Sequence, residues 1–93
     1  MRNKISEKIA RERRKQIEKW GIQNHHPLKW LAILVEEVGE AAEMCNELTP
    51  VLLPKWKSQE LNAKLEKELV QTAAVCVAWL ESLEFTKKLE KSK

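Results

Sequence analysis

The sequence predicts an all-α fold in which three main helices and a short C-terminal helix form a bundle that is completed by oligomerisation. Apolar residues recur at spacings of three and four, and no stretch shows the alternation typical of a strand. Only two Gly and three Pro interrupt the 93 residues. This length suits one domain, residues 1–93, with a core so modest that association with copies of itself would add stability.

Residues 3–20 are expected to form the first helix. Its apolar stripe is thin and consists of Ile5, Ile9, Ile17 and Trp20. Gly21 is well placed as the C-cap, because glycine adopts the backbone conformation that ends many helices.

A polar connector, residues 21–27, leads into a second helix that is expected to begin at residue 27 or 28 and to end at residue 48. Pro27 suits the first turn of a helix, where its missing N–H is not needed. Asn24 or His26 is expected to cap this helix. The helix is apolar over much of its circumference, which indicates a central position, and Thr49-Pro50 ends it.

Residues 49–57 are expected to form a loop that packs against the helices. Its apolar residues are Val51, Leu52, Leu53 and Trp56. Ser58 is a good N-cap for a third helix that reaches about residue 84. The apolar stripe of that helix consists of Leu61, Leu65, Leu69, Thr72, Cys76, Trp79 and Leu83. The lysine-rich residues 85–93 are expected to fray or to form the short fourth helix.

The net charge of +3 is mild, but it is unevenly distributed. Residues 1–19 hold eight basic and three acidic side chains, so this segment carries +5 and the remainder is net negative. Two interpretations are open: a solvated helix face, or a surface that attracts a polyanion such as a triphosphate or a nucleic acid. The overall charge alone does not indicate nucleic-acid binding.

Cys45 and Cys76 have apolar neighbours and are interpreted as small buried thiols in a reducing cytoplasm. The charged N-terminus does not resemble a signal peptide. The longest apolar run, Trp30 to Val35, is too short to span a membrane, so a cytoplasmic protein without a membrane partner is expected. Three tryptophans are expected in the core or in a subunit interface: Trp30, Trp56 and Trp79.

Four oxygen-bearing side chains interrupt the apolar faces of the second and third helices. They form two pairs spaced i, i+3, Glu37 with Glu40 and Glu68 with Gln71, so each pair lies on one side of its helix. An unpaired buried carboxylate is costly and needs a cation or a proton. A divalent metal between the helices would compensate these acids, and Mg²⁺ prefers oxygen ligands. Gln71 can offer its carbonyl oxygen or hydrogen-bond a ligating carboxylate.

The alternative is that these acids face solvent or pair with lysine and arginine. Glu36 lies about 100° around the helix from Glu37 and is a candidate base or second-metal ligand. Candidate substrate contacts surround the connector: Trp20, Gln23, Asn24, His25 and Lys29. The indole can stack on a base, the amides can bond a base edge or ribose, and the histidine and the lysine can contact phosphate. Alternatively, Trp20 anchors the first helix in the core.

The order Glu37-x-x-Glu40, a proline-containing loop and Glu68-x-x-Gln71 resembles the MazG-like, all-α nucleoside triphosphate pyrophosphohydrolases. The usual family pattern is Glu-x-x-Glu followed by Glu-x-x-Asp. Gln23-x-His25-x-Pro27 resembles the dCTP pyrophosphatase-like branch. The segments 19–25 and 68–80 resemble small MazG-like proteins of bacteria and their phages. The resemblance covers roughly residues 10–83.

The resemblance implies Mg²⁺-dependent attack of water on a nucleoside or deoxynucleoside triphosphate, with Mn²⁺ as an alternative ion, and release of pyrophosphate. Glu37, Glu40 and Glu68 would be metal ligands, and Glu36 or Glu40 the base. Gln71 stands where the family usually has Asp and is expected to bind metal more weakly. A homodimer or dimer of dimers with a house-cleaning role would follow.

Two other functions remain as alternatives. One is a nucleotide-binding or regulatory helical module with weak catalysis, which the neutral Gln71 favours. The other, less favoured, is a basic adaptor that binds nucleic acid through residues 2–19.

Overall fold

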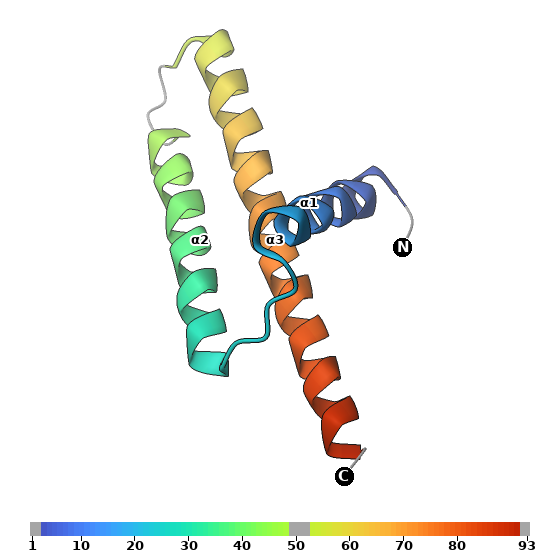
Figure 1. Ribbon diagram of the computed structural model, residues 1–93. Helices are drawn as coiled ribbons and strands as arrows, with labels where there is room; N and C mark the ends of the chain where they lie inside the picture. Colours follow the sequence, from blue (N-terminus) through green and yellow to red (C-terminus); the bar gives the residue numbers. More distant parts are fainter. Residues whose placement is uncertain (1–2, 49–52, 92–93) are drawn as a thin grey trace.

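The computed structural model describes residues 3–48 and 53–91 and contains, within these ranges, three helices and no strand (Figure 1). The helices are α1 (Lys4–Trp20), α2 (Pro27–Leu48) and α3 (Lys55–Lys91). The prediction of an all-α fold is therefore confirmed.

Both ends of α1 are defined by local hydrogen bonds. The Asn3 side chain accepts from the Ser6 N–H, and the Ser6 hydroxyl accepts from the Asn3 N–H, each at 3.0 Å. This reciprocal pair satisfies donors that a helix start leaves free. At the other end Gly21 has φ 76°, and its N–H donates to the Ile17 carbonyl at 2.7 Å. Gly21 is thus the C-cap that the sequence predicts.

The connector ends at His26, which caps α2. Its carbonyl accepts from the N–H groups of Lys29 and Trp30, and its Nδ1 accepts from the Leu28 N–H at 3.1 Å. Pro27 is the first helical residue, as predicted. Helix α2 ends at Leu48, and the predicted stop at Thr49-Pro50 lies outside the described residues, as do Val51 and Leu52.

Helix α3 corrects three predictions. It begins at Lys55 rather than after Ser58, because the Pro54 carbonyl already accepts from the N–H groups of Lys57 and Ser58 at 3.0 Å. Trp56 lies in the first turn with 65% of its surface exposed, so its predicted packing in a loop of this chain is wrong, and a place in a subunit interface stays a prediction. Leu53 is half-buried. Residues 85–91 continue α3 without a break, and the described part of the chain has no fourth helix. No Gly or Pro interrupts residues 55–91.

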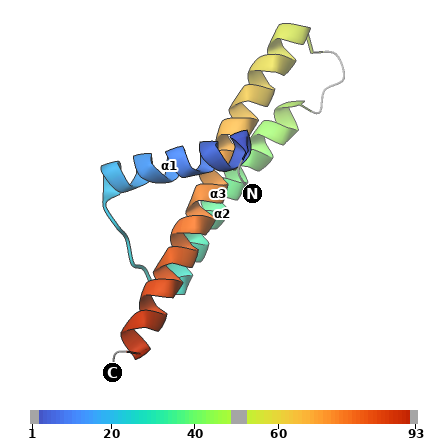
Figure 2. The same ribbon diagram turned by 90° about the vertical axis from the view of Figure 1, so that its right-hand side faces the viewer.

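Helix α3 is the axis of the fold. Helix α2 packs alongside it in the opposite direction, and α1 crosses it on another side (Figures 1 and 2). Trp30 of α2 is 2% exposed and packs with Val75 and Ala78 of α3. Ile33, Leu34 and Trp79 border this core. The expected central position of α2 is wrong, because α1 and α2, both described over their full lengths, each contact α3 and do not contact each other. The expected core positions of Trp30 and Trp79 agree with this packing.

A large share of the surface remains uncovered. The chain measures 60 × 28 × 24 Å with a radius of gyration of 16.3 Å, against about 12 Å for a compact domain of this length. Its accessible surface is 7420 Å², against about 5,600 Å² for a compact monomer of this mass. No helix in the described ranges combines the length and the apolar character that a membrane crossing requires.

Both cysteines are exposed, contrary to the prediction of buried thiols. Cys45 follows the half-buried Met44 on α2, and Cys76 follows the buried Val75 on α3, so each thiol lies on the outer side of a helix whose inner side is covered. The sequence pattern shows that a helix face is apolar, but it does not show whether that face is covered by the same chain or by another molecule. The prediction of buried thiols was wrong for this reason.

Candidate functional site

Three glutamates from two helices converge on one point. Glu37 and Glu40 extend from α2 and Glu68 from α3, and one carboxylate oxygen of each lies within 4.8 Å of the others. We call these three residues the acid cluster. The i, i+3 spacing on α2 and the packing of α2 against α3 bring them together, so the predicted convergence is present.

Within the acid cluster, Glu37 and Glu68 are half-buried and Glu40 is exposed. Glu37 Oε2 and Glu68 Oε1 are buried and have no hydrogen-bond partner in the described structure. Hydrogen bonding and charge repulsion from Glu68 raise the pKa of Glu40. Burial, followed by the neighbouring Glu37, raises the pKa of Glu68. Carboxylates this close, with orphaned oxygens, have the composition and spacing of a site for a hard divalent cation.

A pocket of about 420 Å³ opens beside the acid cluster, between the C-terminal half of α1 and the α2–α3 pair. We call it the acid pocket. Its walls are Glu12, Lys15, Gln16, Lys19, Trp20, Glu37, Lys67 and Gln71. Three lysines thus face this pocket together with Glu12 and Glu37, and Glu37 is also part of the acid cluster. Cations beside a metal site are the charge arrangement that polyphosphate binding requires.

Trp20 lies on the wall of this pocket and not in the core. Its surface is 60% exposed, which excludes the interpretation that it anchors α1 within this chain. The Lys19 ammonium lies 4.8 Å from the centre of the indole ring. An indole with a cation over it keeps its other face available to an aromatic ring.

Gln71 and Glu36 differ in their relation to the cluster. Gln71 is half-buried on the wall of the acid pocket, one turn after Glu68. Glu36 is exposed and is not part of the acid cluster. The position of Glu36 outside the acid cluster therefore does not support a role as metal ligand or base. The roles of Glu36 and Gln71 stay predictions.

The two connector amides line a different cavity of about 400 Å³, together with Arg13, Ile17, Ile22, Ala78, Glu81, Ser82 and Phe85. Asn24 Oδ1 accepts a hydrogen bond from the buried Ser82 hydroxyl. Ser82 follows Glu68 by 14 residues, about 21 Å along α3. The structure thus separates Gln23 and Asn24 from the acid cluster of the same chain.

His25 and Lys29 are also outside the described walls of the acid pocket. The His25 ring lies 4.9 Å from the Trp30 ring, tilted by 58°, and its Nε2 is buried without a partner. Lys29 is exposed in the first turn of α2, about 12 Å along the helix from Glu37. Substrate contact by these residues stays a prediction.

The sequence interpretation missed Lys15 and Lys67 as site residues. Two signals could have found them. Lys15 and Lys19 are spaced i, i+4 in the basic first segment and therefore share a helix face, and Lys67 directly precedes Glu68.

Other basic residues of α1 serve its attachment to α3. Lys8 pairs with Glu66, and Arg13 Nε lies 2.6 Å from Glu81 Oε1. Part of the positive charge of residues 1–19 is thereby matched within the chain.

Comparisons of the chain with protein-family models, with curated proteins and with solved structures find no match. The case for a function therefore rests on the acid cluster, the acid pocket and the resemblance of the motifs.

Proposed function

We propose that this protein is a Mg²⁺-dependent nucleoside triphosphate pyrophosphohydrolase of the MazG-like type, which converts a nucleoside or deoxynucleoside triphosphate and water into the monophosphate and pyrophosphate. One observation carries the proposal: the acid cluster borders a pocket lined by three lysines and a tryptophan. A cytoplasmic protein that controls a nucleotide pool would fit this activity.

Glu37, Glu40 and Glu68 would hold the ion, and Gln71 is placed to add a neutral oxygen. The orphaned oxygens of Glu37 and Glu68 support this assignment, because a buried carboxylate oxygen without a donor needs a cation or a proton, and a bound ion would supply the first. Bound Mg²⁺ would neutralise part of the triphosphate charge and position water.

The remaining pocket residues would bind and orient the substrate. Lys15, Lys19 and Lys67 supply positive charge for the phosphates. Trp20 offers an aromatic face for the base. Such contacts would bring the phosphate chain close to the carboxylates, which is the proximity that hydrolysis requires.

Glu40 is the favoured base of the two candidates. Water attacks the α-phosphorus, the bond from that phosphorus to the α–β bridging oxygen breaks, and pyrophosphate leaves. Glu40 lies in the cluster and would therefore be close to a water molecule held by the ion. Glu36 is exposed and outside the cluster.

We further propose a homodimer as the working unit, or a dimer of dimers. The surface exceeds that of a compact monomer by about 1,800 Å², and stable interfaces bury about 800 Å² or more per partner. Exposed apolar side chains on all three helices support this assembly.

A nucleotide-binding module with weak catalysis is the second candidate. Gln71 favours it, because a neutral amide in the acid pocket holds a divalent cation less firmly than a carboxylate. A nucleic-acid adaptor is less favoured, since Lys8 and Arg13 are paired with α3.

Pyrophosphate release from a panel of ribo- and deoxynucleoside triphosphates, measured with Mg²⁺ and with chelator, tests the proposal. Metal-dependent release of pyrophosphate from at least one nucleotide is the expected result. Nucleotide-induced thermal stabilisation without release would favour the binding module. Neither stabilisation nor release would overturn both.

A further inference from the structure

Helix α3 carries an uncovered apolar stripe. Leu69, Leu80 and Leu83 are 53%, 62% and 43% exposed, and Cys76 between them is exposed as well. With the half-buried Ala73 these residues follow spacings of four and three, the repeat that packs one helix against another. We call this set the α3 seam.

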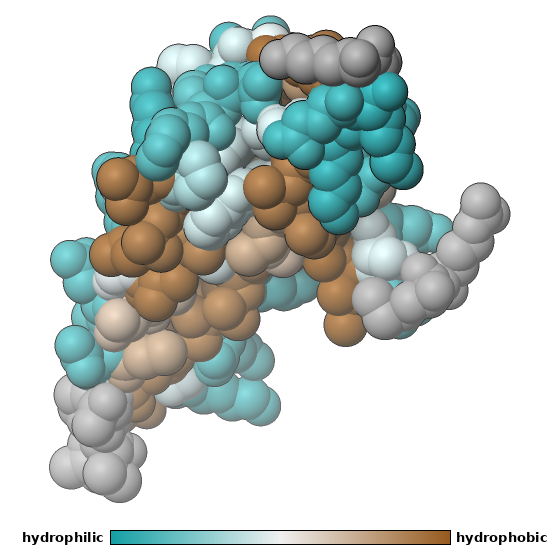
Figure 3. Space-filling model, turned by 90° about the horizontal axis from the view of Figure 1, so that it is seen from below, coloured by the Kyte–Doolittle hydropathy of each residue, from teal (hydrophilic) through white to brown (hydrophobic). Residues whose placement is uncertain are grey.

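Helix α2 carries a similar stripe, with Leu31, Val35 and Val38 all exposed. At about 100° per residue, Val38 and Val35 lie about 100° and 160° around α2 from Glu37. Cys76 and Leu69 lie about 140° and 160° around α3 from Gln71. Both stripes therefore turn away from the acid pocket. A band of hydrophobic residues is visible on one face of the molecule in Figure 3.

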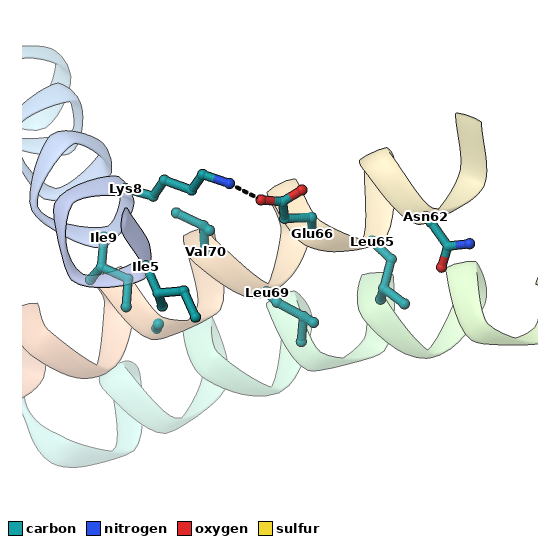
Figure 4. A pocket seen from close by; sticks show the side chains of 9 residues that line it. Ile5, Lys8, Ile9, Asn62, Leu65, Glu66, Leu69 and Val70 are labelled. Carbon is teal, nitrogen blue, oxygen red and sulfur yellow. Dashed lines mark hydrogen bonds and ion pairs between the residues drawn. The ribbon is translucent and has the colours of Figure 1, made fainter. Parts of the chain in front are cut away.

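The N-terminal part of the α3 seam borders an apolar groove of about 450 Å³ between α1 and α3 (Figure 4). Its walls are Ile5, Lys8, Ile9, Asn62, Leu65, Glu66, Leu69, Val70 and Ala73. Leu69 and Ala73 belong to both the seam and the groove. Whatever covers the seam therefore also reaches the groove.

The α3 seam is nearly symmetric about Cys76. Leu69 and Leu83 lie seven residues before and after it. Leu80, four residues after Cys76, has the half-buried Thr72 beside the seam as its counterpart. Ala73, three residues before Cys76, has the half-buried Trp79 as its counterpart. A stripe of this kind is self-complementary when two copies run antiparallel, as a two-fold interface requires. The occupant that the pattern fits best is a second copy of α3.

We propose that two chains pair their α3 helices antiparallel about a two-fold axis at Cys76, so that the C-terminal part of each seam covers the groove of the other chain. The partner's Leu83 then lies against Leu69. Lys87 follows Cys76 by eleven residues and Glu66 precedes it by ten, so the pairing brings Lys87 close to the partner's ion pair of Lys8 and Glu66. This deepens the proposed homodimer by assigning its helix and register.

Oxidative cross-linking tests the register with the native cysteines. The Cys45→Ser chain keeps only Cys76, and the Cys76→Ser chain is the matched control. Diamide takes up the two protons and two electrons that two thiols lose as they join. On non-reducing gels the Cys45→Ser chain should form covalent dimers and the control should not. Cross-linking through Cys45 alone, or through neither cysteine, would overturn the register.

A charge exchange tests the same register without sulfur chemistry. Leu69→Lys and Leu83→Glu should each raise the dimer dissociation constant about tenfold or more, because each buries a charge among leucines. The double variant should recover affinity, since the two new charges face each other across the axis. Double-variant affinity no better than that of the weaker single variant would refute the pairing.

These outcomes separate the register from the earlier proposals. A dimer by light scattering that fails both tests keeps the homodimer and overturns the register, whereas a monomer overturns both. Pyrophosphate release from the same samples reports on hydrolysis independently.

Discussion

The two flanks of the α2–α3 pair are built from the same two helices but differ in chemistry. One flank carries the acid cluster and the acid pocket, and α1 covers it in part. The other carries Leu31, Val35 and Val38 of α2 and the α3 seam, which remain exposed. Without a ligand or a partner, each flank lowers the stability of the fold. Charge repulsion does so on the flank with the acid cluster, and contact of apolar side chains with water does so on the other flank. The first thus calls for a cation, and the second for another protein surface.

The largest expected effect comes from removing one charge of the acid cluster. Glu37→Gln or Glu68→Gln should lower pyrophosphate release about 100-fold or more, because the ion loses a ligand. The same variants should melt at an equal or higher temperature without metal, since repulsion is relieved. Glu43→Gln, exposed on the same helix, is the matched control. A similar loss of pyrophosphate release in Glu43→Gln would show that the effect is not specific to the acid cluster.

On the opposite flank, Val35→Lys should raise the dimer dissociation constant about tenfold or more, because it places a charge in an apolar interface. Mg²⁺ binding should persist, since Val35 points away from the acid cluster. Glu47→Lys puts the same residue on another side of α2 and should leave the dimer intact. Sedimentation velocity over a dilution series measures both. An unchanged dimer dissociation constant in Val35→Lys would show that the apolar stripe of α2 is not part of the interface.

A several-fold effect is expected at the border of the acid pocket. Gln71→Asp should lower the Mg²⁺ concentration needed for half-maximal activity, because it adds a charged ligand one turn after Glu68. Gln16→Asp adds the same charge on the α1 side of the acid pocket and should lower the required Mg²⁺ concentration by a smaller factor. Mg²⁺ titrations of both variants decide the matter. An unchanged or higher requirement in Gln71→Asp would indicate that the amide serves the substrate.

The smallest expected effect is on the pH dependence of stability without metal. The raised pKa values of Glu40 and Glu68 mean that the folded chain binds more protons than the unfolded chain above the ordinary glutamate pKa of about 4.3. The free energy of unfolding should therefore rise as pH falls from neutral through the raised values. Glu68→Gln should flatten this slope in urea unfolding series. The same slope in wild type and variant would assign it to other groups.

Features that depend on one residue's backbone were predictable from sequence. Gly21 ends α1 and Pro27 begins α2 as expected, because few other residues suit those positions. The start of α3 was not predictable from Ser58, since the Pro54 carbonyl starts the helix one turn earlier.

Within the candidate site, the convergence of the acids followed from two i, i+3 pairs on neighbouring helices. The separation of Gln23 and Asn24 from those acids did not. It depends on where α1 crosses α3, which long-range contacts such as Arg13 with Glu81 hold. Nothing local in residues 21–27 encodes that crossing point.

The attachment of α1 has a consequence for motion. None of its residues Lys4–Trp20, all of them described, is fully buried, and α3 holds it through half-buried isoleucines and ion pairs. The exposed pair of Lys8 and Glu66 contributes about 0–1 kcal/mol, whereas the Arg13 side chain in the second pair is only 12% exposed. Local unfolding of α1 should therefore cost less than global unfolding, and its amides should exchange hydrogen before those of α3. Lys15, Lys19 and Trp20 of α1 form one wall of the acid pocket. The observed affinity for a ligand in this pocket therefore depends on the fraction of molecules in which α1 is folded and docked on α3.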